Sequence, residues 1–317
     1  MKRIVYYHSW DEDIVQSRRQ DIRLRHDYEY VRYGVWNRLL DWLLLALLWI
    51  VGTVYVRLVR RVHIHGRERL RPYLHSGLFL YGNHTQPVLD PFIALLTLTG
   101  SRPYGIVSTA NFGIPVLGRL MPWCGALPVL HTALGQRQLA QAVYEHIRLG
   151  HPIVVYPEAH VWPYCTQIRP FSAASFAWAV ETGKPVFTMT TVYRHKRLGE
   201  KDTSNKQYGN NGKSIDCGNN ADYNRHTCNS KDNGCYADHG KYDSNADCEN
   251  DVSSRHSAPK IDVYIDGPFF PDATCAPRLA RQRLCAVVRE AMLSRATQSD
   301  YEYILYRPAP ADTPNPQ

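Results

Sequence analysis

The stretch YGNHTQPVLDPF, residues 81–92, carries two side chains that could perform acid–base chemistry. His84 follows the apolar run LFLY, and Asp90 comes six positions later. An imidazole has an ordinary pKa of about 6.5, so it can take up a proton near neutral pH. A carboxylate that holds the other ring nitrogen fixes the tautomer and stabilises the imidazolium. The pair His84–Asp90 therefore suits a general base and its orienting acid.

Asp90 also has a purely structural interpretation. It stands immediately before Pro91 and an apolar segment, where an N-cap residue followed by proline at the first helical position is expected. A single histidine among 14 is more often a packed or exposed loop residue than a base. The two roles of Asp90 are compatible, because a capping carboxylate has a second oxygen.

Alternating strand and helix patterns after Gly66 predict an α/β domain, with a mostly parallel sheet flanked by helices. Strands are expected at 77–82, 103–109, 152–158, 184–194 and 260–269. Helices are expected at 91–99, 133–149, 172–182 and 277–295. The last of these should bury a stripe made of Leu284, Val287, Val288, Ala291 and Met292.

A third polar side chain, Glu158, follows the predicted strand IVVY. In a parallel sheet, the carboxyl ends of the strands line one ligand crevice. We therefore expect His84 and Glu158 to meet, although 74 residues separate them in the sequence.

An apolar helix is expected at 34–61, before the α/β domain. From Trp42 to Val56 a run of 15 residues has no charge. A full membrane span needs about 20 apolar residues, so spanning is marginal and insertion into one leaflet fits as well. A buried helix of a soluble core is the alternative. Interfacial aromatic residues flank or interrupt the run and favour the membrane: Trp36, Trp42, Trp49 and Tyr55.

The net charge of +8 and the pI near 9.0 suit either an anionic membrane surface or nucleic acid. Charge alone supports nucleic acid, whereas the neighbouring apolar helix points to lipid. We therefore expect membrane lipid, and no nucleic acid, as a partner. The first 30 residues contain no apolar stretch typical of a signal peptide. The domain is therefore expected at the membrane, on its cytoplasmic side.

The chain divides by composition into six parts. They are a polar segment at 1–33, the apolar helix at 34–61, the first part of the α/β domain at 62–196, a low-complexity insertion at 197–259, the last strand and helix at 260–306, and a Pro-rich tail at 307–317. The insertion has too few large apolar residues to offset the entropy of ordering it. It holds four of the eight cysteines but no C-x-x-C pair, so a metal site is disfavoured.

Four blocks resemble the phospholipid/glycerol acyltransferase family in order and separation. They are GNHTQPVLD, GALPVLH, IVVYPEAHVWPYCTQIRPF and GKPVFTMTTVYR, and the resemblance covers roughly residues 60–195. It implies transfer of a fatty acyl group from a thioester of coenzyme A or acyl carrier protein to a glycerolipid hydroxyl. His84 would be the base and Asp90 its orienter, with no metal or redox cofactor.

The chain departs from the family pattern at three places. Five residues instead of four separate His84 from Asp90, and His131 stands where the second block offers a basic residue. The third block, usually P-E-G-T-R, reads P-E-A-H-V and so keeps Glu158. Because arginine can grip phosphate bidentately, its loss weakens the case for glycerol-3-phosphate or lysophosphatidic acid as acceptor.

The resemblance implies four substrate-binding residues: Glu158, His131, His160, and Arg169, which lies further along the same loop. The sequence has no G-x-S-x-G motif, which presents a nucleophilic serine, so direct transfer of the acyl group to the acceptor is favoured over an acyl-serine intermediate.

Two other classes of function remain open. One is a membrane-bound lipid-binding module with the same fold and no catalysis. The other is an interaction protein acting through residues 201–258.

Overall fold

The computed structural model describes residues 3–15, 24, 28–32, 34–115, 117–195 and 259–310. The chain has two structural units. All described residues belong to the first unit, and the second unit, 197–241, lies outside the described residues. The predicted insertion at 197–259, except Pro259, and the tail beyond residue 310 also lie outside the described residues.

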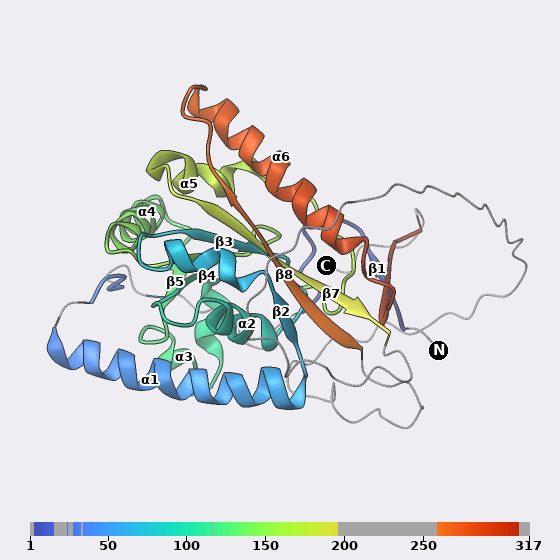
Figure 1. The fold of residues 1–317 in the computed structure, drawn as a ribbon, viewed down its shortest axis with the longest axis horizontal. Coiled ribbons are helices and arrows are strands. Elements are labelled where there is room, and N and C mark those ends of the chain that lie inside the picture. The colour runs from blue at the N-terminus through green and yellow to red at the C-terminus, as the bar shows by residue number, and fades with distance from the viewer. Residues whose placement is uncertain are drawn as a thin grey trace, which may run out of the picture. The chain divides into compact units, whose positions relative to one another are not determined.

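A seven-stranded sheet forms the centre of the fold (Figure 1). The strands lie side by side in the order β2 (His63–His65), β8 (Lys260–Phe269), β7 (Val186–Arg194), β3 (Phe79–Gly82), β6 (Ile153–Val155), β4 (Tyr104–Ser108) and β5 (Ala126–Val129). Five of the six pairings are parallel, and only β7–β8 is antiparallel. The predicted α/β class with a mostly parallel sheet is confirmed.

Helices cover both faces of this sheet, as Figure 1 shows. One face carries α4 (Ala133–Arg148), α5 (Ala177–Thr182) and α6 (Pro277–Ala296), whose apolar residues pack on the sheet in one core cluster. The other face carries α2 (Leu89–Thr97), whose apolar residues belong to a second core cluster, and the apolar helix α1 (Val35–Thr53), which packs against α2 at Gly52. The carboxyl ends of the central strands are therefore held between two apolar layers.

Short elements complete the described part of the chain. They are a π-helix at Val54–Val59, 3₁₀ helices at Arg67–Tyr73, Thr109–Gly113 and Ala173–Phe176, helix α3 (Leu117–Leu120), and a parallel pair of strands, β1 (Arg3–Tyr7) and β9 (Ile304–Pro308). Two residues assigned by sequence to the Pro-rich tail, Arg307 and Pro308, instead belong to β9. The burial of Ile304 and Tyr306 against Trp162 explains this order.

The stripe predicted for α6 is buried at three of its five positions, and Ala291 is only half-buried. Leu284, Val288 and Met292 are buried, whereas 46% of Val287 is exposed. The helix buries Ala280, Leu284, Cys285, Val288 and Met292, so its buried face is centred near Val288 and Val287 turns to the solvent side.

The apolar helix packs along the domain through both of its ends. Near its start, Asp41 is buried and its Oδ2 lies 2.7 Å from Nη2 of Arg102. Near its end, Gly52 lies so close to α2 that an added Cβ would stand 2.8 Å from Cδ1 of Phe92. Together with the π-helix it spans Val35–Val59, which is long and apolar enough to cross a membrane.

Candidate active site

His84 and Glu158 lie at the ends of two adjacent strands. β3 pairs with β6 in the register Tyr81↔Val155, so both chains leave the sheet at the same edge. The backbone N–H of His84 donates to Oε2 of Glu158 at 3.1 Å. The two residues therefore meet, as the strand-end argument predicts.

His84 and Asp90 form a direct pair. Nδ1 of His84 lies 2.8 Å from Oδ2 of Asp90, and 18% of the imidazole is exposed against 1% of the carboxylate. The same oxygen accepts the backbone N–H groups of Thr85 at 3.1 Å and Gln86 at 3.0 Å. The five intervening residues thus turn around the carboxylate, and the longer spacing leaves the pair intact. Because Nδ1 is engaged, Nε2 is the nitrogen left to take a proton.

The predicted N-cap role of Asp90 is wrong. Helix α2 begins at Leu89 with Val88 at the cap position, and no side chain caps it. Asp90 is the second helical residue, and its carboxylate turns back to the preceding loop instead of the helix amides. Pro91 is consequently the third helical residue, where its missing N–H is still harmless. The Asp90 carboxylate binds the His84 imidazole and two backbone N–H groups of the loop instead of capping the helix.

Tyr156, which was not among the predicted site residues, supports the imidazole from one side. Its ring stacks on that of His84 with centroids 4.4 Å apart and 22° between the planes. Its hydroxyl donates to the backbone carbonyl of Asp90 at 3.0 Å. Tyr156 therefore holds both members of the pair, and its position directly after β6 was the signal that could have identified it.

The β7 side of the site is also held by residues that sequence reasoning missed. The amide side chain of Asn83 exchanges two hydrogen bonds with the backbone of Thr191, at 3.1 and 2.8 Å. The hydroxyl of Tyr193 lies 2.7 Å from Oγ1 of Thr85 and 2.8 Å from Nε2 of Gln86. Burial, and then the charge of Asp90, raise the pKa of Tyr193, so it remains a neutral phenol.

Glu158 and Arg169 form a wholly buried ion pair. Oε2 of Glu158 lies 3.1 Å from Nη2 of Arg169, and Oε1 accepts the backbone N–H of Arg169 at 3.0 Å. Burial raises the pKa of Glu158, although Arg169 and the backbone N–H groups of His84 and Arg169 oppose the shift. Both residues were predicted to bind substrate, but neither side chain reaches the surface. In this conformation they support the loop that carries His84.

The loop after Glu158 is itself tied to the His84 loop and to the chain ends. The backbone N–H of Trp162 donates to the carbonyl of His84 at 3.0 Å. The Arg169 guanidinium lies over the Trp162 indole at 4.8 Å and donates to the carbonyls of His160 and Trp10. This packing explains why Trp162 is fully buried.

The two histidines predicted to bind substrate lie elsewhere. The side chain of His160 is 38% exposed, and its Nδ1 lies 3.7 Å from Oδ1 of Asp13. His131 is exposed after β5, which is three strands from β3. At the usual strand spacing this separation is roughly 14 Å. The structure therefore does not bring His131 to His84.

Ala159, at the position of the family's glycine, has a left-handed backbone with φ of 64°. An L side chain is strained there, whereas glycine is not. Glycine relieves this strain but also increases the conformational entropy of the unfolded chain, which opposes the gain. We expect Ala159→Gly to raise the free energy of unfolding by about 1 kcal/mol net. Urea denaturation measures the change. The control Ala140→Gly, inside α4, should destabilise by about 1 kcal/mol, and destabilisation by Ala159→Gly would contradict the argument.

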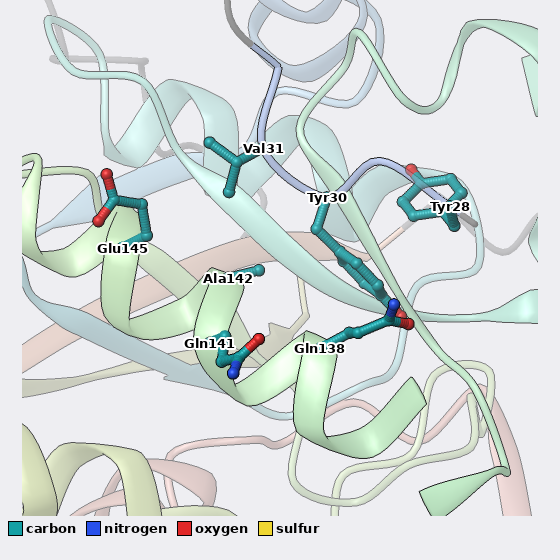
Figure 2. A pocket seen from close by; sticks show the side chains of 7 residues that line it. All are labelled: Tyr28, Tyr30, Val31, Gln138, Gln141, Ala142 and Glu145. Atoms are coloured by element: carbon teal, nitrogen blue, oxygen red, sulfur yellow. The ribbon is translucent and has the colours of Figure 1, made fainter. Parts of the chain in front are cut away.

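A cavity of about 410 Å³ lies away from this pair, between residues 28–31 and α4. Figure 2 shows its lining, made of Tyr28, Tyr30, Val31, Gln138, Gln141, Ala142 and Glu145. Most of these side chains are polar, so the cavity does not suit a fatty acyl chain. In the described part of the chain, no group of three His, Cys, Asp or Glu residues could hold a metal ion.

Residues 61–192 match the sequence model of a family described as Acyltransferase. Among solved structures, the chain is similar to the 1-acyl-sn-glycerophosphate (LPA) acyltransferase PlsC from Thermotoga maritima. The identity is 13% and the TM-score 0.47, over 82% of this chain and 83% of that one. A search of curated proteins found no match. The matched residues hold the first three motif blocks, all but the last two residues of the fourth, and the His84–Asp90 pair, so this part of the chain is similar to the acyltransferase family.

Proposed function

We propose that this protein transfers a fatty acyl group from an acyl thioester to a hydroxyl of a lysophospholipid or other glycerolipid. The observation that carries the proposal is the His84–Asp90 contact of 2.8 Å at the carboxyl edge of the sheet. The imidazole is partly open to solvent while its partner is buried, which is the arrangement that a general base requires.

In this mechanism the acceptor hydroxyl oxygen attacks the thioester carbonyl while Nε2 of His84 takes the hydroxyl proton. Asp90 stabilises the imidazolium that forms. When the tetrahedral intermediate collapses, the carbon–sulfur bond breaks and the imidazolium returns the proton to the thiolate. Hydrogen-bond donors must stabilise the oxyanion during these steps. Every proton and electron is accounted for without a redox cofactor.

Tyr156, Glu158 and Arg169 would act as positioning residues. Tyr156 restrains the plane of the imidazole, and Glu158 holds the backbone N–H of His84. Arg169 keeps Glu158 charged inside the fold. This assignment replaces direct substrate contact for Glu158 and Arg169, because neither side chain is accessible.

An activity panel tests the function. Purified protein in lipid vesicles is incubated with labelled acyl-CoA or acyl carrier protein and with lysolipids that differ in headgroup. We expect an esterified product with at least one donor and acceptor. The alternative, a lipid-binding module with altered second and third blocks, predicts lysolipid binding without any product.

We further propose that α1 lies in one leaflet, parallel to the membrane surface, with the domain on the cytoplasmic side. The helix contacts the domain at Asp41, and the π-helix that continues it contacts the domain at Val56, roughly 22 Å further along the axis. A spanning helix would draw the domain surface into the bilayer. The side away from the domain exposes large apolar residues, including Trp36, Trp42, Leu43, Leu47 and Ile50.

The substitution Leu47→Glu is expected to weaken vesicle binding by about tenfold or more, because a charge would replace an apolar group in the leaflet. Sedimentation with anionic vesicles measures the bound fraction. Leu293→Glu, at an exposed position of α6 on the other face of the sheet, is the matched control and should bind normally. Equal binding by both variants would contradict the proposed orientation.

A further inference from the structure

Both backbone groups of His84 are bound by the loop that contains Glu158 and Trp162. The N–H of His84 donates to Oε2 of Glu158 at 3.1 Å, and its carbonyl accepts the backbone N–H of Trp162 at 3.0 Å. A general base works only where its imidazole meets the substrate in one geometry, and the backbone sets where that imidazole stands. Whatever holds Glu158 and Trp162 therefore also positions His84.

The two residues that hold the base are in turn held by the first residues of the chain. Nη1 of Arg169, the ion-pair partner of Glu158, donates to the backbone carbonyl of Trp10 at 3.3 Å. The indole N–H of Trp162 donates to the backbone carbonyl of Glu12 at 2.9 Å. Two short series of contacts thus connect the start of the chain with the two backbone groups of the base.

Aromatic packing keeps the start of the chain against this loop. The Trp10 ring stacks on the Trp162 ring, with centroids 5.5 Å apart and 23° between the planes. Tyr306 of β9 also stacks on Trp162, at 4.9 Å, and its hydroxyl donates to the carbonyl of Pro163 at 2.8 Å. Because β1 pairs with β9 (Figure 1), both ends of the described chain meet at Trp162.

A turn after β1 presents the two carbonyls to the loop. The backbone N–H of Glu12 donates to the carbonyl of Ser9 at 3.3 Å, and the Glu12 carboxylate accepts the backbone N–H of His8 at 2.8 Å. Oγ of Ser9 accepts the backbone N–H of Asp11 at 3.0 Å. Local bonds of this kind between side chain and backbone fix turns. The turn is therefore ordered by its own residues.

The start of the chain contributes little to the folding core. Neither of the core clusters that pack on the two faces of the sheet includes a residue from the described stretch 3–15. Its contacts gather instead on Trp162 and Arg169, which are both fully buried. Without this stretch, buried donors of the loop would lose their acceptors, whereas the sheet and its helices would keep their packing.

We propose that residues 3–14 form a positioning segment of the active site, in which Trp10 fixes the backbone of His84 through Trp162 and Arg169. The inference rests on the proposed acyl transfer and deepens it, because it names a further element that sets the position of the base. A displacement of about 1 Å in a catalytic group can cost roughly 10²-fold in rate. Trp10 is a positioning residue, and its effect on the rate comes from the position of His84.

The substitution Trp10→Ala tests this role, because it removes the stacked ring and frees the carbonyls of Trp10 and Glu12 from the loop. It should lower kcat for acyl transfer by about tenfold or more, and leave KM for acyl-CoA and for the lysolipid within about threefold. Trp10→Phe keeps a ring for the stack and should recover most of the rate. Tyr6→Ala is the matched control, because this tyrosine of β1 is 50% exposed, and it should show wild-type values.

Hydrogen exchange followed by NMR measures how firmly His84 is held, without any turnover. In Trp10→Ala the backbone amides of His84 and Trp162 should exchange about tenfold faster or more, since the hydrogen bonds of both loosen. Amides inside α4 should be unchanged, and so should both site amides in Tyr6→Ala. Trp10→Leu keeps an apolar contact without the stacked ring, and the same results are expected of it if Trp10→Ala does not fold.

Unchanged kcat in Trp10→Ala would overturn the proposal. Faster exchange without a loss of rate would also overturn it, because that is the behaviour of a purely structural tether. A rise in KM alone, or equal effects of Trp10→Ala and Tyr6→Ala, would contradict it as well. If the wild-type protein transfers no acyl group, the proposed function fails, and hydrogen exchange alone decides the positioning segment. Faster exchange of the His84 amide in Trp10→Ala then supports it, and unchanged exchange excludes it.

Discussion

The substitution His84→Ala is expected to lower the rate of acyl transfer by about 10²- to 10⁴-fold, the usual contribution of a positioned general base. The effect should appear in kcat, because the imidazole acts when the hydroxyl oxygen attacks, and KM for the acceptor should change little. Initial rates with labelled acyl-CoA measure it. Full activity in His84→Ala would exclude the proposed mechanism.

His75→Ala provides a matched control. His75 is exposed and precedes β3, so it lies toward the opposite edge of the sheet from His84. This variant should retain wild-type kcat. Asp90→Asn should also lower kcat strongly, because an amide cannot stabilise the imidazolium or hold the same tautomer. If Asp90→Asn changed only stability, the carboxylate would be a structural residue of the 85–90 turn.

Arg169→Met is expected to lower the free energy of unfolding by about 3 to 5 kcal/mol, the largest stability effect that we predict. The reason is Glu158, which would remain buried without its counter-ion. Burial already raises the pKa of this carboxyl with Arg169 present, so its charged form depends on the guanidinium. Urea denaturation of the two variants measures the difference.

The double variant Glu158→Gln/Arg169→Met removes both charges and should recover much of this loss, since a buried ion pair is often no more stable than a neutral pair. An exposed ion pair supplies the control. Arg148 lies 2.7 Å from Glu145 with 70% of its side chain exposed, and Arg148→Met should change stability by less than about 1 kcal/mol. Comparable losses for Arg148→Met and Arg169→Met would contradict the role of burial.

Much of the fold follows from local sequence patterns. Apolar runs of four to ten residues predict β3, β4, β6, β7 and β8, and 3.6-residue periodicity predicts α4 and α6. The meeting of His84 with Glu158 was also predictable, because parallel strands end at a common edge. These features depend on short-range patterns and on one general rule of sheet topology.

Contacts between distant segments could not be predicted in this way. Tyr156 and Tyr193 are apolar-looking strand residues in the sequence, yet their hydroxyls organise residues 85–90. Strands β1 and β9 pair across almost the whole chain. Each of these contacts depends on which surfaces the folded core brings together, and no local pattern records that.

The sequence by itself determined the fold class, the apolar helix, and the residues able to act as base and orienter. Those properties follow from residue type and spacing, which act over a few neighbouring positions. Only the tertiary structure decided that Asp90 serves His84 instead of capping α2, and that Glu158 and Arg169 are buried supports. Likewise, only the folded chain brings Trp10 and Glu12, from the start of the chain, to the loop beside His84. Burial and partner choice are properties of the packed chain, because both depend on groups that lie far apart in the sequence.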